Sequence, residues 1–426
     1  MDSSPAALAS TAPRYRHPYA VLTVMCLIAL ISVAGVSLPY PILAPLFAGS
    51  ELNALNHWRG YDPTLLLGIA LAANPLGILI GGAVLGALSD VLGRRKVLSA
   101  SLALALAGYL LSAWALWQQN YPLFVLSRLF TGLCEGSVSI CRAFAADLHP
   151  EIDRNISISW MNSALYAAWL VGPLLGGLTM HLGAHVPFLI AALIMLPCLL
   201  LLWWLIPADP LTPSHQGLWQ TVRTHNSLQM LTYPALRYLV LTQLIYTIGL
   251  NAFYEFYPLF LVQYEQFDGA AIGYITALLC LLMTGMSALV MARFGQRFTP
   301  LPAAMAAALV FVLLLALLPT QSGWLCWLLL VLCGLPIPMV SSWFQVYCTA
   351  TFGALGMGRI MGLLTLLMCS GNFIIALLGA YIAKWDVRFT LWLGALCILL
   401  SVVCLAMEWR QRRQPLPSSH REASSG

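Results

Sequence analysis

Long runs of apolar residues, separated by short polar segments, dominate the chain from about Tyr19 onwards. The runs lack the period-2 alternation of a half-buried strand, and each is long enough, at about 20 residues, to cross a bilayer as a helix. The pattern therefore predicts spanning helices at residues 19–46, 64–88, 97–117, 122–146, 156–182, 186–206, 236–262, 270–292, 301–319, 323–347, 357–383 and 387–408.

Composition supports a membrane protein. Of the 426 residues, 60% are hydrophobic and 8% are charged, against roughly 25% charged residues in an average soluble domain. The net charge of +5 lies in short loops rather than on one soluble face, so we expect no nucleic-acid partner. The cysteines fall mostly within the apolar runs without a CxxC pair or a Cys/His cluster, which indicates buried free thiols and no metal site.

Lysine and arginine alternate between the loops. The loop around Arg94, Arg95 and Lys96 is strongly basic, whereas the loops of the other side hold Arg59, Lys384 and Arg388. By the positive-inside rule, this asymmetry places both termini in the cytoplasm, in a bacterial-type inner (plasma) membrane.

The longest loop divides the predicted helices into two sets of six. We expect a cytoplasmic N-terminal tail at 1–18, a six-helix bundle at 19–206, a cytoplasmic central loop at 207–235, a second six-helix bundle at 236–408 and a cytoplasmic C-terminal tail at 409–426. Within the central loop, residues 218–231 either form an amphipathic helix on the membrane surface or act as a plain tether. Two such halves suggest an internal duplication, as in many transporters.

The run Gly86-Ala-Leu-Ser-Asp90-Val-Leu-Gly93-Arg94-Arg95-Lys96 joins the second and third helices. Gly86 lets a neighbouring helix approach closely, and Gly93 permits a tight turn. Asp90 can accept hydrogen bonds from loop arginines or from a helix N-terminus. Such a charge cluster either latches one conformation of the protein or serves as a simple positive-inside anchor.

This run resembles the signature loop of the major facilitator superfamily. The resemblance implies an all-α membrane fold of about twelve helices in two six-helix pseudo-repeats. It also implies a conformational latch formed by Gly86, Asp90, Gly93, Arg94 and Arg95, which Asp147 joins by pairing with Arg94; a solvated loop acid is the alternative for Asp147. Major facilitators usually work as monomers, and we expect the same here.

The fifth predicted helix carries Gly172-Pro173-Leu-Leu-Gly176-Gly177. Proline removes a backbone hydrogen bond and bends a helix, and the glycines allow tight packing beside the bend. The segment resembles the signature of the drug:proton antiporter branch of the superfamily, although Ser159 and Ala168 stand where that signature has glycine. An ordinary proline kink is the alternative interpretation.

The fourth predicted helix holds three charges, Arg128, Glu135 and Arg142, at intervals of seven residues. In a continuous helix this spacing puts all three on one face. Charges inside a membrane face the bundle interior or a water-filled cavity. Because burial and neighbouring arginines act on Glu135 in opposite directions, this carboxyl is a candidate to load and release a proton. A static Glu–Arg pair is the alternative.

The seventh helix supplies a second proton-coupling candidate, Glu255, unless this residue lies wetted at the outer interface. Further polar and aromatic residues suit a cavity for a drug-sized ligand. The substrate-cavity candidates are Arg128, Arg142, Gln243, Tyr246, Asn251, Tyr254 and Gln345. Near Gln345, Tyr347 fits an interfacial aromatic belt better than the cavity.

The sequence therefore predicts a secondary transporter that exports a drug-like compound or a metabolite against a flow of protons, by alternating access around a midplane site. We expect no cofactor, because the transmembrane proton gradient supplies the energy; the partners are the small-molecule substrate, protons and the bilayer. Alternatives are a proton symporter or uniporter that imports a small, possibly anionic nutrient, and an exporter of a carboxylate siderophore. An enzyme is not expected, since HExxH, GxSxG and phosphate-cradling motifs are missing from the sequence.

Overall fold

The computed structural model describes residues 17–49, 53–148, 151–206, 233, 236–287, 297–352 and 357–413, and the regular structure of these residues is helical. In the first half, the helices are α1 (Pro18–Ser37), α2 (Tyr40–Ala48), α3 (Pro63–Leu92), α4 (Arg94–Trp117), α5 (Tyr121–Cys134), α6 (Ser137–Asp147), α7 (Arg154–Thr179) and α8 (Val186–Leu205). In the second half, they are α10 (Arg237–Glu265), α11 (Gly269–Gly285), α13 (Pro300–Leu317), α14 (Gly323–Leu332), α15 (Pro336–Phe352), α16 (Met357–Ala383) and α17 (Val387–Arg413).

Each of the twelve predicted spans corresponds to one of these helices or to two consecutive ones. Ten spans of the described chain are long and apolar enough to cross a membrane, and α11 is a shorter apolar helix. The remaining span, α10, is more polar but 29 residues long. The prediction of an all-α membrane fold with about twelve helices in two halves is confirmed. The predicted amphipathic stretch at 218–231 lies outside the described residues.

Three predicted helices are in fact interrupted. The first breaks at Leu38-Pro39 between α1 and α2, and the tenth breaks before Pro336 between α14 and α15. Proline has no N–H to continue the hydrogen-bond ladder, and its ring crowds the preceding turn. In the fourth span, α5 ends at Cys134 and α6 begins at Ser137, so that Glu135 and Gly136 lie in the break.

Gly93 makes the predicted tight turn between α3 and α4. Its φ of 95° lies in a region that side chains with a Cβ rarely adopt, and the same residue ends one helix and begins the next.

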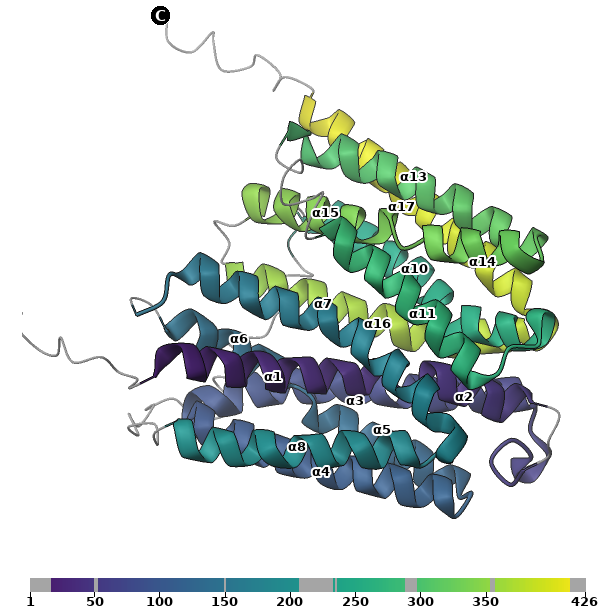
Figure 1. Ribbon diagram of the computed structural model, residues 1–426. Coiled ribbons are helices and arrows are strands. Elements are labelled where there is room, and N and C mark those ends of the chain that lie inside the picture. The colour runs from purple at the N-terminus through teal and green to yellow at the C-terminus, as the bar shows by residue number, and fades with distance from the viewer. Residues whose placement is uncertain are drawn as a thin grey trace, which may run out of the picture.

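The two halves lie against each other along α3, α7 and α2 on one side and α16, α11 and α10 on the other (Figure 1). A shared apolar core crosses this boundary, where Leu43 and Phe47 of α2 join Phe256 and Phe260 of α10. Two smaller cores belong to one half each. Among the described residues, the halves therefore meet along three helix pairs, α3 with α16, α7 with α11 and α2 with α10.

Glycine and alanine bring the facing helices together at the end of the molecule where α7 ends and α11 begins. A side chain at Gly177 would collide with Gly273, and one at Gly68 would collide with Ala376 and Ala380. Small residues at such positions let backbones approach closely, which favours helix association in a bilayer.

The contact between α3 and α5 gives a test of this packing. A methyl group added at Gly132 would collide with the carbonyl oxygen of Asn74. We therefore expect Gly132→Ala to destabilise the protein by about 1–3 kcal/mol, as overpacking does in other cores. A melting temperature several degrees below wild type, measured in detergent, would show this.

Gly82→Ala on α3 is the matched control, because a methyl group there meets no described atom within 4 Å. Its melting temperature should equal that of wild type or exceed it slightly, since alanine favours a helix. Equal melting temperatures for the two variants would contradict the close approach of α3 and α5.

Candidate functional site

Buried polar residues gather around the helix break at Glu135. This side chain is 4% exposed. The hydroxyl of Tyr109 on α4 donates to Oε1 at 2.5 Å, and Nδ2 of Asn74 on α3 donates to Oε2 at 2.8 Å. An ionised carboxylate only accepts hydrogen bonds, so one donor on each oxygen matches the ionised form of Glu135.

The polar groups at the break are satisfied partly within the same span and partly by neighbouring helices. The N–H of Glu135 donates to the carbonyl of Gly132 at 3.1 Å, and the hydroxyl of Ser101 on α4 donates to the carbonyl of Cys134. The hydroxyls of Ser32 on α1 and Ser137 on α6 bond to each other at 3.0 Å. Because the bilayer offers no water to exposed peptide groups, an interrupted helix is stable only with such partners.

Arg128 on α5 shares a neighbour with Glu135. Its side chain is 2% exposed, and its guanidinium carbon lies 5.9 Å from the ring centre of Tyr109 and 5.7 Å from that of Phe188 on α8. Tyr109 thus contacts both charged groups. A cation held over aromatic rings is stabilised by their negative faces, more so where water is excluded.

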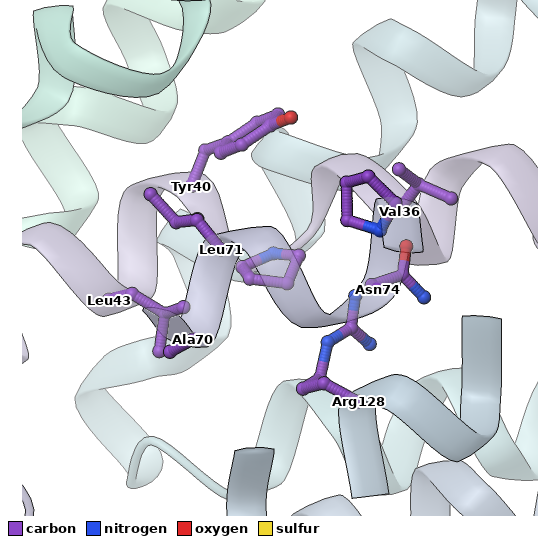
Figure 2. A pocket seen from close by; sticks show the side chains of 9 residues that line it. Val36, Tyr40, Leu43, Ala70, Leu71, Asn74 and Arg128 are labelled. Atoms are coloured by element: carbon purple, nitrogen blue, oxygen red, sulfur yellow. The ribbon is translucent and has the colours of Figure 1, made fainter. Parts of the chain in front are cut away.

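A narrow pocket opens beside Arg128 and Asn74, between α1, α2, α3 and α5 (Figure 2). Its cavity volume of about 10 Å³ is room for about one water molecule. The lining residues are Val36, Pro39, Tyr40, Leu43, Ala70, Leu71, Asn74, Pro75 and Arg128. Two buried polar atoms here, Oδ1 of Asn74 and Nη1 of Arg128, have no hydrogen-bond partner among the residues that the structure describes.

Glu255 on α10 lies inside the molecule. It is 2% exposed, and neither carboxyl oxygen has a hydrogen-bond partner. The alternative of a wetted residue at the outer interface is therefore wrong, because the polar face of α10 packs against the rest of the bundle. Nearby on the same helix, Asn251 accepts a hydrogen bond from Nδ2 of Asn372 on α16 at 3.3 Å.

An aromatic stack connects the two halves. Tyr40 on α2 stacks on Trp169 of α7 with ring centres 6.4 Å apart. Trp169 stacks in turn on Tyr254 of α10 at 5.3 Å. Tyr40 also lines the pocket, and it lies close enough to Arg128 and Glu255 for the charges of both groups to act on its hydroxyl. The stack therefore joins the pocket of the first half to the buried acid of the second.

Other cavity candidates fall in different places. Arg142 and Gln345 are exposed, Tyr246 is buried, and the half-buried Gln243 donates to Thr247 at 3.3 Å. The predicted shared face of Arg128, Glu135 and Arg142 is wrong, because the break between α5 and α6 interrupts the helical phase on which the spacing argument depended.

Tyr347 does not belong to an aromatic belt. It is buried, and its hydroxyl donates to Oε1 of Glu408 on α17 at 2.6 Å. Glu408 is a buried acid that the sequence argument missed, because it lies close to the basic C-terminal tail and resembles an ordinary interfacial residue.

Of the predicted latch, the side chains of Gly86, Asp90 and Asp147 lie outside the described part of the structure, so their pairing stays a prediction. Arg95 is described: its Nη2 donates to the carbonyl of Trp203 on α8 at 2.9 Å, and its guanidinium lies over the Trp203 ring.

The glycines of α7 make the predicted close contacts. Gly172 packs on Ala34 of α1, Gly176 on the carbonyl of Leu38, and Gly177 on Gly273 of the second half. Pro173 lies within the helix between them. The segment therefore lies where α7 meets both α1 and the opposite half.

Sequence reasoning missed the residues that surround the charged groups. Asn74, Tyr109, Tyr40 and Trp169 lie on four different helices and resemble ordinary polar or aromatic members of apolar runs. The one available signal was Asn74 itself, since an amide is rare in the middle of a spanning helix. Its partner could not be read without the packing of α3 against α5.

Comparison with known proteins agrees with this architecture. The family model of the Major Facilitator Superfamily matches residues 25–376. The class D tetracycline resistance protein of Salmonella ordonez is 26% identical over 92% of this chain and 96% of that protein. The Staphyloferrin B transporter of Staphylococcus aureus is 35% identical over 35% of this chain and 34% of that protein.

Coverage differs between relatives. The match to the class H tetracycline resistance protein of Pasteurella multocida spans 40% of that protein. Among solved structures, the human organic anion transporter MFSD10 superposes with a TM-score of 0.68 at 21% identity, over 91% of this chain and 99% of that one. This last likeness concerns the fold alone.

The two six-helix halves, the signature loop at Gly93 and the family match over most of the chain agree with one another. The protein is a multi-pass membrane protein, and the chain belongs to the major facilitator superfamily.

Proposed function

We propose that this protein is a proton-coupled exporter of a small, partly aromatic molecule, working as a monomer in a bacterial inner membrane with both termini in the cytoplasm. The observation that carries the proposal is the buried Glu135, which lies in a helix break and holds one hydrogen-bond donor on each carboxyl oxygen. No cofactor is required, because the transmembrane proton gradient supplies the energy.

Protonation of Glu135 would change its surroundings. A protonated carboxyl carries its own O–H, which needs an acceptor, whereas the two groups now bound to the carboxyl, the Tyr109 hydroxyl and Nδ2 of Asn74, are both donating to it. The break between α5 and α6 is a point at which the fourth span can adjust its direction. Loading a proton therefore favours a different arrangement of α3, α4 and α5, which is the requirement for coupling a proton to a conformational change.

The contacts between the halves support alternating access. Gly177 and Gly273 bring α7 and α11 into close contact at one end of the molecule, and the shared apolar core lies around α2. Opening that end requires these surfaces to separate while each half keeps its own smaller core. Rocking of the two halves around a central site satisfies both conditions.

The aromatic stack and the pocket suggest the kind of substrate. Separation of the halves would uncover flat apolar faces of Trp169 and Tyr254, which now stack on each other, and Tyr40 connects them to the polar groups of Arg128 and Asn74 in the pocket. This combination suits a planar molecule with one polar end. The likeness to tetracycline resistance proteins supports a drug-like compound or a related metabolite.

A second candidate is an anionic solute. The buried Nη1 of Arg128 has no hydrogen-bond partner in the pocket, and a carboxylate would satisfy it. Partial likeness to the Staphyloferrin B transporter supports export of a carboxylate siderophore. Import of an anionic nutrient uses the same site in the opposite direction, because the gradient and the order of binding set the direction of transport.

The first test measures proton release from acidified, inverted membrane vesicles after addition of lipophilic cations, neutral antibiotics or polycarboxylates. We expect one class to release protons from wild-type vesicles and Glu135→Gln to abolish the release at normal expression, because glutamine cannot carry the proton. Glu255→Gln, measured beside it, shows whether the second buried acid shares this role.

Unchanged proton release in Glu135→Gln would remove Glu135 from the mechanism. No release with any compound, together with uptake into intact cells, would favour the importer and leave Arg128 as the residue to study.

A second test addresses the contact between the halves. Valine at position 177 would hold α7 and α11 apart, because even a methyl group there collides with Gly273. We expect Gly177→Val to lower the transport rate in proteoliposomes roughly tenfold, corresponding to about 1.4 kcal/mol.

Gly285→Ala, also at the α11 side of the second half, is the control and should transport at the wild-type rate, since its added methyl group meets no described atom within 4 Å. A fully active Gly177→Val protein would show that this close contact is not part of the transport cycle.

A further inference from the structure

Asn74 connects the candidate proton site to the pocket. Its Nδ2 donates to Oε2 of Glu135 at 2.8 Å, while its Oδ1 is buried without a hydrogen-bond partner. The residue also lines the pocket beside Arg128, and Figure 2 shows the two side chains next to each other. One amide group therefore contacts the carboxylate on one side and the pocket on the other.

The charge of Glu135 determines which end of the amide it binds. An ionised carboxylate only accepts, so Asn74 must direct its NH₂ group to Glu135 and leave the acceptor Oδ1 for the pocket. A protonated carboxyl whose other oxygen accepts from Tyr109 has an O–H to donate, and Oδ1 of Asn74, which has no partner among the described residues, is an acceptor that half a turn of the amide brings to it. The amide then turns over and leaves its NH₂ group for the pocket.

We propose that Asn74 relays the protonation state of Glu135 to the pocket by turning its side-chain amide, and so selects the substrate group that binds there. With Glu135 ionised, the pocket offers the donor Arg128 and the acceptor Oδ1, which match a primary amide or a hydroxyl beside a carbonyl. With Glu135 protonated, the pocket offers two donors, which match a carboxylate. The inference rests on the proposed function in taking Glu135 as the proton site.

The relay gives a physical reason why the protein would exchange a proton for a substrate molecule. A substrate whose polar end is an amide or a hydroxy-carbonyl group binds while Glu135 is ionised, and loading the proton replaces its acceptor partner with a second donor. A site with the wrong hydrogen-bond polarity leaves buried groups unpaired and rejects the ligand strongly. Proton and substrate then exclude each other, as antiport requires, whereas a carboxylate would bind together with the proton.

The groups that could complicate the titration are few in this part of the structure. Tyr109 on α4 and Arg128 and Cys134 on α5 are the titratable or charged groups that face Glu135. From α3 the facing group is Asn74, and α1 contributes Ser32 through its bond to Ser137; neither titrates.

Infrared titration of the purified protein in lipid nanodiscs, with isotope-labelled asparagine, tests the relay without any substrate. We expect a carboxylic-acid band, lost in Glu135→Gln, and an asparagine carbonyl band that moves to lower frequency at the same pH, because Oδ1 then accepts from the carboxyl. Asn74→Leu should remove the asparagine response. Asn120→Ser, at the N-cap of α5 and outside the pocket, should keep it.

Formamide and formate are the smallest matched probes for so narrow a pocket, since they share size and shape and differ in hydrogen-bond polarity. The ratio of their dissociation constants, measured by NMR on the same nanodiscs, should change roughly tenfold in favour of formate as Glu135 takes its proton. The ratio should be constant in Asn74→Leu. In Glu135→Gln the ratio at every pH should equal the ratio that wild type shows when Glu135 is protonated, because the introduced amide can donate to Oδ1 of Asn74.

The relay is overturned if the carboxylic-acid band of Glu135 titrates without a matching shift of the asparagine carbonyl band. It is also overturned if no carboxyl titrates over the pH range in which the protein is folded. A ratio that changes equally in wild type and Asn74→Leu overturns the assigned selectivity. The infrared titration tests the relay, and proton release from vesicles tests the proposed export. Matching infrared bands in a protein that releases no protons with any compound would support the relay and reject the antiporter.

Discussion

Every backbone polar group within the bilayer must find its partner inside the protein, and the central region of this protein is organised by that constraint. Interrupting the fourth span at Glu135 exposes peptide groups that a continuous helix would bond internally. Ser101 and the carbonyl of Gly132 satisfy two of them, and Tyr109 and Asn74 bind the carboxylate itself. A buried acid and a helix break are therefore held in place by the same neighbouring helices.

Close packing makes this arrangement possible. Gly132 lets α5 approach the backbone of α3 near Asn74, so that the amide reaches the carboxylate from the adjacent helix. Larger residues would separate the helices and leave the acid without its donors, at a cost of about 1–3 kcal/mol for each unsatisfied group. Small residues between the halves, such as Gly177 and Gly273, serve a different purpose, since they join surfaces that the proposed alternating access would separate.

The two halves contribute unlike parts to the central region. The first half supplies Glu135, Arg128 and the narrow pocket, while the second supplies Glu255 and Tyr254. Trp169 and Tyr40 carry the aromatic stack between them. The two halves therefore share a six-helix architecture while their buried functional groups differ.

The sequence by itself determined the helical membrane fold, the number of spans, the turn at Gly93 and the presence of charges inside the membrane at Arg128 and Glu135, whereas the burial of Glu255 came from the structure. These features follow from local properties, namely the length of apolar runs, the conformational freedom of glycine and the high cost of a charge in lipid. The tertiary structure alone decided that the fourth span breaks at Glu135, that Arg142 leaves the shared face, and that Asn74, Tyr109, Tyr40 and Trp169 surround the charges. Hydropathy records whether a segment enters the membrane, but the partner of a side chain depends on which faces of different helices pack together.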